Sequence, residues 1–238
     1  MIILGHRGYS AKYPPNTLLA FMKAIEYGAD GVELDIWLTK DGEIQVSHDR
    51  NLRKTAGVNV DVKKSTQEEI GRYNIQGEPI PLLREVYEKL PGYAIINVEI
   101  KDESSVEGAL KIVEEYDAME RTLFSSFNIK ALKRLRKLSK EARIGILIGD
   151  VNKLYTIPRW IYSLKPHYLN LPYQLSSFGK AGSRALIRFY RLFGVRIGFW
   201  TPNSPEDLEV FEGLYEMVIT DEVEKMLKLR ERTHGFKA

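Results

Sequence analysis

Cysteine is absent from this 238-residue chain, which excludes disulfide bonds and thiolate metal sites. Long apolar runs are also absent, and no stretch approaches the ~20 apolar residues of a membrane-spanning helix. Neither sign of charge dominates, because 35 Lys and Arg are set against 32 Asp and Glu, for a formal net charge of +3. An excess this small and dispersed argues against a nucleic-acid partner.

The first residues, MIILGHRG, lack the basic leader and the longer apolar segment of a secretory signal. We therefore expect a cytoplasmic protein with no stable membrane insertion, and the oligomeric state stays open. With 44% hydrophobic residues, the chain is long enough to bury one large core. Because no low-complexity linker divides it, we expect a single domain over residues 1–238.

The chain does contain a regular alternation of short apolar runs with stretches of helical periodicity. Over this length, the alternation predicts an α/β fold with a parallel sheet, and the number of units favours a (β/α)₈ TIM barrel. The first helix should start after Asn16 or Thr17 as N-cap and stop at Gly28. The expected strands are 2–4, 31–38, 43–47, 94–100, 122–125, 143–148, 168–171, 195–200 and 217–220.

This set contains one strand more than an eight-stranded barrel needs. Asp41-Gly42 is a strong hairpin signal, so the strand that follows it should run antiparallel to its predecessor and lie outside the barrel. A two-residue loop at Asp41-Gly42 would place His48 roughly opposite Asp35. We expect segment 39–75 to form a hairpin and cap insertion at the barrel mouth.

Carboxylates recur near the ends of two expected strands. Glu33 and Asp35 in GVELDIWL are two residues apart, so they point to one face, as do Glu99 and Lys101 in IINVEIK. Like charges on one face repel each other unless a cation or a proton holds them together. Oxygen ligands without cysteine favour Mg²⁺ or Ca²⁺ over Zn²⁺. Taken alone, each pair could equally be a solvent-facing pair on an edge strand.

The position of these residues favours one shared site. Barrel enzymes place their catalytic groups at the carboxyl ends of the strands. Polar or aromatic residues end several of the expected strands: His6; Glu33 and Asp35; Glu99 and Lys101; Ser125 and Ser126; Trp200 and Thr201.

The chain has only four histidines, and two of them fall near this acidic cluster. His6 and His48 could each donate or accept a proton near neutral pH. Arg7 suits a phosphoryl group but could equally form a surface ion pair, and Gly8 would let the backbone turn close to a ligand. Trp200 is either a pocket wall or a side chain that fills the barrel.

Eight motifs, in order along the chain, resemble the glycerophosphodiester phosphodiesterase family. They are HRG at 6–8, NTLLAF at 16–21, GADGVELDIWLTKDG at 28–42, SHD at 47–49, NVEIK at 97–101, FSSF at 124–127, FWT at 199–201 and VITDE at 218–222. The resemblance implies a distorted TIM barrel with a small insertion after the second strand. It also implies metal-dependent hydrolysis of a small glycerophosphodiester to sn-glycerol 3-phosphate and an alcohol.

The resemblance further implies a role for individual residues. The metal ligands would be Glu33, Asp35 and Glu99, for Mg²⁺, Ca²⁺ or Mn²⁺, and the acid and base would be His6 and His48. Substrate or phosphate contacts would come from Arg7, Lys101, Asn16 and Trp200. Either histidine can serve as the acid, and the residues are compatible with a cyclic phosphate intermediate or with direct attack by water.

One position departs from the family, because Pro15 in YPPNT stands where a Glu commonly precedes the Asn-Thr pair. The missing carboxylate should alter metal affinity or substrate preference without abolishing activity. One alternative is a lysophospholipase D-like or phospholipase C-like enzyme on lysophospholipids, although the spacing of Phe189, Tyr190 and Phe193 is that of a helix face packed on the barrel. The other is a non-catalytic phosphate-ester binding protein.

Overall fold

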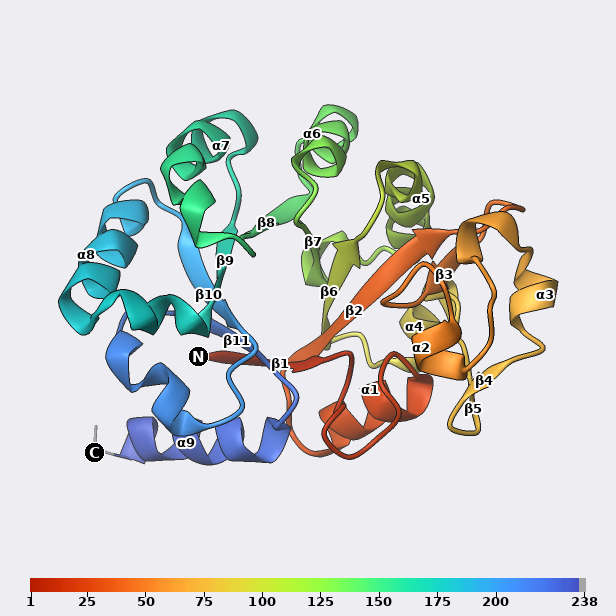
Figure 1. The fold of residues 1–238 in the computed structure, drawn as a ribbon, viewed down its shortest axis with the longest axis horizontal. Helices are drawn as coiled ribbons and strands as arrows, with labels where there is room; N and C mark the ends of the chain where they lie inside the picture. Colours follow the sequence, from red (N-terminus) through yellow and green to blue (C-terminus); the bar gives the residue numbers. More distant parts are fainter. Residues whose placement is uncertain (236–238) are drawn as a thin grey trace.

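Eight parallel strands close into a barrel in the computed structural model, which describes residues 1–235 without the side chains of 151–153, 178 and 233–235 (Figure 1). Strand β1 pairs with both β2 and β11, and this pairing closes the sheet. The predicted TIM barrel is thereby confirmed. The strands are β1 (Ile2–His6), β2 (Gly31–Leu38), β6 (Ile95–Ile100), β7 (Thr122–Ser126), β8 (Arg143–Leu147), β9 (Tyr168–Pro172), β10 (Arg196–Trp200) and β11 (Met217–Thr220).

Helices follow the strands and pack on the outside of the barrel. The α-helices of the repeating units are α1 (Leu18–Glu26), α4 (Leu83–Lys89), α5 (Val106–Glu115), α6 (Ile129–Leu138), α7 (Ile157–Leu164), α8 (Lys180–Arg191) and α9 (Val223–Gly235). After β10 the connection is a 3₁₀ helix, η6 (Pro205–Phe211), which breaks the regular pattern. Further 3₁₀ turns are η1 (Val62–Lys64), η2 (Glu103–Ser105), η3 (Met119–Arg121), η4 (Val151–Thr156) and η5 (Tyr173–Phe178). Within residues 1–235, no helix has the length and apolar character needed to cross a bilayer.

Helix α8 differs in one respect from the sequence expectation. Ile187 and Tyr190 are buried against the barrel, but Phe189 and Phe193 remain about half exposed. Part of the predicted packed face therefore points to solvent.

Helix α1 is capped by the second of the two candidate residues, because Thr17 Oγ1 accepts a hydrogen bond from Ala20 N at 3.2 Å. The loop before the helix crosses it closely at Gly8, which has a φ of +85°. A Cβ atom on Gly8 would lie 2.5 Å from the carbonyl carbon of Ala20. Glycine is therefore required because the backbone passes close to α1. The sequence had instead suggested that the backbone at Gly8 passes close to a ligand.

The hairpin predicted at Asp41-Gly42 is present, and β3 (Ile44–Val46) runs antiparallel to β2 outside the barrel. Its loop is one residue longer than expected, because Thr39 N donates to Glu43 O at 2.9 Å. Gly42 has a φ of +91°, the left-handed conformation that closes a three-residue hairpin loop.

The longer loop shifts the pairing register by one residue, so the predicted alignment of His48 with Asp35 is wrong. Ser47 N donates to Asp35 O at 2.9 Å instead, and His48 follows one residue later. The chain turns at this point, where Ser47 Oγ donates to Asp49 O at 2.8 Å. Trp37 Nε1 donates to the His48 carbonyl oxygen at 3.2 Å, which fixes the position of the histidine backbone.

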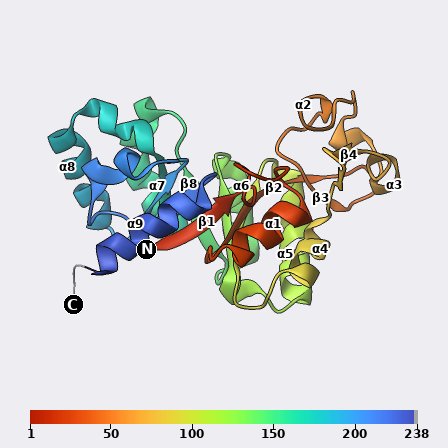
Figure 2. The same ribbon diagram turned by 90° about the horizontal axis from the view of Figure 1, so that it is seen from below.

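The rest of the insertion lies beside the barrel, at one end of the molecule (Figure 2). It contains α2 (Arg53–Ala56), α3 (Gln67–Ile70), β4 (Asn74–Ile75) and β5 (Glu78–Pro79). Its own small apolar cluster consists of Leu52, Val62, Ile70, Ile75 and Ile80. An ion pair of 2.9 Å between Lys63 Nζ and Asp102 Oδ2 connects it to the loop after β6.

The barrel interior is filled at its amino-terminal end. The inward-facing cluster there consists of Leu4, Leu123, Tyr168, Met217 and Ile219. A larger apolar layer separates the strands from the surrounding helices. The carboxyl ends of the strands thus remain available for polar side chains.

Candidate active site

The carboxyl ends of the strands surround a pocket of about 120 Å³. Its lining residues are His6, Arg7, Glu33, His48, Asn97, Glu99, Lys101, Ser125, Phe127, Leu147, Trp200, Thr201 and Ile219. Two of the predicted site residues, Asp35 and Asn16, are buried and do not line the pocket. All the other predicted site residues line it, so the structure brings together side chains that are far apart in the sequence.

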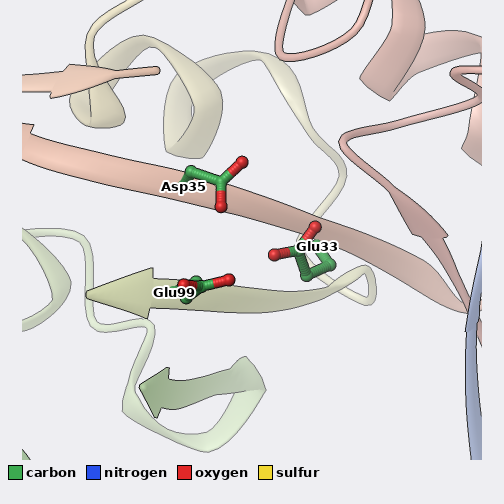
Figure 3. A group of neighbouring side chains, drawn as sticks. All are labelled: Glu33, Asp35 and Glu99. Carbon is green, nitrogen blue, oxygen red and sulfur yellow. The ribbon is translucent and has the colours of Figure 1, made fainter. Parts of the chain in front are cut away.

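Three buried carboxylates come together on two neighbouring strands (Figure 3). Parallel pairing of β2 with β6 places Asp35 beside Glu99, and Glu33 points to the same face two residues earlier. One carboxylate oxygen from each of the three lies within 4.8 Å of the others. An all-oxygen set of this kind fits a hard divalent cation such as Mg²⁺ or Ca²⁺.

The electrostatics of the cluster also fit a cation. Burial raises the pKa of Glu33 to about 7 and that of Glu99 to about 8, and the charge of Asp35 adds to both shifts. Ionisation of all three carboxylates therefore costs free energy unless positive charge is added nearby. A divalent cation bound between the carboxylates would lower that cost.

Two cationic side chains stabilise the carboxylates. Lys101 Nζ lies 2.7 Å from Asp35 Oδ1 and 2.6 Å from Glu99 Oε1, and Arg7 Nε lies 3.3 Å from Asp35 Oδ2. Burial by itself would raise the pKa of Asp35, but the charges of Lys101 and Arg7 outweigh burial and lower it. Both cations line the pocket, so each can contact the carboxylates and an anion at once.

The loop after β1 positions Arg7 and Asn16 in an unusual backbone conformation. Their φ angles are +57° and +59°, in the left-handed region that few non-glycine residues adopt, although Asn does so more readily than most. Asn16 N donates to Arg7 O at 2.9 Å, and Asn16 Nδ2 donates to Asp35 Oδ2 at 2.8 Å. Asn16 thus orients a carboxylate from behind, and the helix cap is Thr17. Pro15, immediately before Asn16, contributes no carboxylate to the site.

The two histidines of the pocket differ in their surroundings. His6 Nδ1 lies 2.7 Å from Asp221 Oδ1, and His6 Nε2 lies 4.0 Å from Glu33 Oε2. Burial lowers the pKa of His6, but the hydrogen bond with Asp221 and the charge of Glu33 outweigh burial and raise it. Burial also lowers the pKa of His48, and there the charge of Asp35 does not fully compensate. His48 Nδ1 lies 3.2 Å from Asp49 Oδ1.

Asp221 is a site residue that sequence reasoning missed. It follows β11 and accepts hydrogen bonds from Ser10 Oγ at 2.7 Å and Asn203 Nδ2 at 2.9 Å, in addition to its contact with His6. Burial would raise its pKa, but the hydrogen bond with His6 and the other contacts lower it, so the carboxylate is ionised. The signal was present in VITDE, where an acidic residue immediately follows the last strand.

An aromatic pair forms one wall of the pocket. The rings of Phe127 and Trp200 lie 5.4 Å apart at 85°, an edge-to-face contact. Trp200 Nε1 donates to Asn170 O at 3.3 Å, which fixes the indole at the end of β10. Phe127, which is 45% exposed, was not among the predicted site residues.

A sequence model of the Glycerophosphoryl diester phosphodiesterase family matches residues 6–225, a range that includes every residue of the pocket. The chain belongs to this family. A glycerophosphodiester phosphodiesterase from Caldanaerobacter subterraneus subsp. tengcongensis is 34% identical over 246 residues, covering 96% of this chain and 97% of its own length. The predicted family and enzyme class, a phosphoric diester hydrolase, are thereby confirmed.

Two further proteins are similar to this chain. The crystal structure of the glycerophosphodiester phosphodiesterase from Thermotoga maritima superimposes with a TM-score of 0.86 at 38% identity, covering 97% of this chain and 98% of that one. Lysophospholipase D GDPD1 from Homo sapiens is 29% identical over 156 residues, which is 59% of this chain and 50% of the human protein.

Proposed function

We propose that this enzyme hydrolyses glycerophosphodiesters to sn-glycerol 3-phosphate and an alcohol, using a divalent metal ion and two histidines. The proposal depends on one observation. A single pocket combines buried carboxylates, two cations and two histidines at the carboxyl ends of barrel strands. Similarity over nearly the whole chain to a named glycerophosphodiester phosphodiesterase supports the substrate class.

The metal ion would be held by Glu33, Asp35 and Glu99, as Mg²⁺ or Ca²⁺, with Mn²⁺ as a further candidate. When bound, the ion supplies positive charge that stabilises the phosphoryl oxygens as negative charge develops on them. Arg7 and Lys101 orient the phosphoryl group by hydrogen bonds and disperse the same charge.

The histidines would transfer protons on either side of the phosphoryl group. One accepts the proton of the nucleophile, and the other donates a proton to the oxygen of the leaving alcohol. When the nucleophile is water, this step yields sn-glycerol 3-phosphate directly. When it is the glycerol 2-hydroxyl, the step yields a cyclic phosphate, which a water molecule then opens while the two histidines exchange roles. Asp221 would accept a hydrogen bond from Nδ1 of His6, which leaves Nε2 of the ring to face the pocket. Each proton transfer is worth roughly 10²- to 10⁴-fold in rate.

The remaining site residues would shape the pocket. Trp200 forms its aromatic wall, and Asn16 maintains the orientation of Asp35. We also propose that residues 1–238 act as one catalytic domain, in which the insertion at 39–75 contributes His48 to the site.

A lysophospholipase D-like activity is the second candidate. It is favoured by the similarity to human lysophospholipase D GDPD1 and by the exposed ring of Phe127 at the pocket, which could contact an acyl chain.

One substrate comparison separates these candidates. The purified enzyme is given glycerophosphocholine, glycerophosphoethanolamine or lysophosphatidylcholine in the presence of Mg²⁺, Mn²⁺ or Ca²⁺. We expect release of sn-glycerol 3-phosphate from the first two. Release of choline from lysophosphatidylcholine alone would support the second candidate, and release from none of the three substrates would contradict the proposal.

A further inference from the structure

The carboxyl-terminal ends of α7 and α8 expose apolar side chains to solvent. Tyr162 is 88% exposed and Leu192 is 83% exposed, while Phe189 and Phe193 are about half exposed. The rings of Phe189 and Phe193 lie 5.3 Å apart, and Phe193 and Tyr162 line the same surface hollow. These four residues, Tyr162, Phe189, Leu192 and Phe193, are here called the α7–α8 patch. Exposed apolar side chains gathered in this way are candidates for an interaction site.

The charges within the sequence segment that carries the α7–α8 patch are of one sign. No acidic residue occurs in segment 151–205, although the chain contains 32 Asp and Glu. The basic residues of this segment are Lys153, Arg159, Lys165, Lys180, Arg184, Arg188, Arg191 and Arg196. The excess is local, because the formal net charge of the whole chain is only +3.

Some of these cations are already engaged in the fold. Arg191 pairs with Glu216 at 2.7 Å, and Arg184 donates to the Val210 carbonyl oxygen at 2.8 Å. In contrast, four others form no ion pair among the side chains that the structure describes. They are Arg159, Lys165, Lys180 and Arg188. Lys165 lines the same hollow as Tyr162 and Phe193, so positive charge lies directly beside the apolar surface.

The chemistry of the α7–α8 patch fits an anionic lipid surface better than a second copy of this chain. Symmetric self-association would bring identical cations together, which is unfavourable. At a bilayer surface, aromatic and leucine side chains can insert at the level of the headgroups while Lys and Arg contact lipid phosphates.

The position of the α7–α8 patch allows docking without blocking the pocket. Tyr162 and Leu192 precede the loops into β9 and β10, at the amino-terminal end of the barrel. The pocket lies at the opposite ends of the strands. Figure 2 also shows α7 and α8 at the end of the molecule away from α2 and α3.

We propose that the α7–α8 patch docks this protein on membranes that contain anionic lipids. This inference is independent of the proposed reaction, because no patch residue lines the pocket.

Sedimentation with lipid vesicles tests the proposal. The full chain is mixed with vesicles of phosphatidylcholine alone, or of phosphatidylcholine with phosphatidylglycerol. We expect several-fold stronger binding to the anionic vesicles, weakened by added salt. The triple variant Tyr162→Ser, Leu192→Ser, Phe193→Ser should lower the partition coefficient by about tenfold or more. The variant Arg159→Gln, Lys165→Gln, Arg188→Gln should remove the preference for anionic lipid.

A matched control removes exposed apolar side chains elsewhere. Tyr93→Ser with Met22→Ser, at positions 73% and 51% exposed, should leave vesicle binding unchanged. All variants should hydrolyse glycerophosphocholine at the same rate as the unaltered enzyme. Equal binding to both kinds of vesicle, or an equal loss in the control, would overturn the proposal. The proposal would also be overturned if the unaltered protein did not bind vesicles and formed a dimer that the triple patch variant dissociates.

Discussion

At the scale of single residues, the pocket depends on side chains that fix the orientation of other side chains. Asn16 holds Asp35, Lys101 spans two carboxylates, and Asp221 holds His6. None of these contacts is visible in local periodicity. Residue types at strand ends predicted which residues would gather, but the partners that orient them depend on exact side-chain geometry.

The histidine pair gives the first prediction. His6→Ala and His48→Ala should each fold normally, because both side chains are partly exposed in the pocket, and each should lower kcat by roughly 10²- to 10⁴-fold. Circular dichroism checks the fold, and release of sn-glycerol 3-phosphate checks the rate. A rate close to that of the unaltered enzyme for either variant would remove that histidine from the mechanism.

The second prediction concerns Asp221 as a positioning residue. Asp221→Asn removes the charge that orients and stabilises the His6 ring, so kcat should fall by roughly 10²-fold while KM changes little. The matched control is Ser10→Ala, which removes another hydrogen bond to the same carboxylate oxygen but leaves the contact with His6. A loss confined to KM, or an equal kcat loss in the control, would contradict this role.

At the scale of elements, loop lengths and packing contacts decide where the site residues lie. The hairpin signal predicted the antiparallel β2–β3 pair, yet the loop has one residue more than expected, which moved Ser47 opposite Asp35. Both loop lengths are compatible with Asp41-Gly42, because a glycine with positive φ closes either one. The pairing register could therefore not be predicted from the sequence alone, whereas the position of His48 near the acidic cluster could be.

The insertion is joined to the barrel by a titratable contact. Burial would raise the pKa of Asp102, but hydrogen bonds from Ser104 and Lys63 outweigh burial and lower it to about 2. A carboxylate with a lowered pKa stabilises the fold above its unfolded pKa, and that contribution is lost as the pH falls towards the folded value.

The third prediction follows from the lowered pKa of Asp102. Asp102→Asn should lower the free energy of unfolding by about 1 kcal/mol at pH 7. The difference from the unaltered protein should shrink as the pH falls from about 4 towards 2. Urea unfolding at several pH values measures it. A difference that stays constant with pH would show that the charge of Asp102 is not its cause.

The fourth prediction concerns the crossing of the first loop over α1. Gly8→Ala would place a Cβ atom against the α1 backbone at a residue with positive φ, so it should destabilise the protein by roughly 2 to 4 kcal/mol. Gly182→Ala in α8 is the matched control, because its Cβ would meet no atom within 4 Å and Ala favours a helix. The control should stabilise slightly. A fall in thermal midpoint of the same size for both variants would contradict the packing argument.

At the scale of the whole molecule, closure of the barrel creates the site. Pairing of β1 with β11 brings Asp221 to His6 across 215 residues of sequence. The strands themselves could be predicted, because each is a short apolar run bounded by turn residues and separated by helical periodicity. The element after β10 could not be predicted in the same way, because the 3₁₀ helix η6 replaces a regular α-helix there. The exposed aromatic side chains of α8 likewise follow a helical spacing that alone suggests burial.

The central claim is that the three buried carboxylates support hydrolysis by holding a divalent cation. The most direct test measures release of sn-glycerol 3-phosphate from glycerophosphocholine in EDTA, and then as Mg²⁺, Mn²⁺ or Ca²⁺ is added back, for the unaltered enzyme and for Glu99→Gln. We predict no release in EDTA, recovery with at least one cation, and a requirement for a much higher cation concentration in the variant. Full activity in EDTA, or recovery of Glu99→Gln at the same cation concentration as the unaltered enzyme, would contradict the claim.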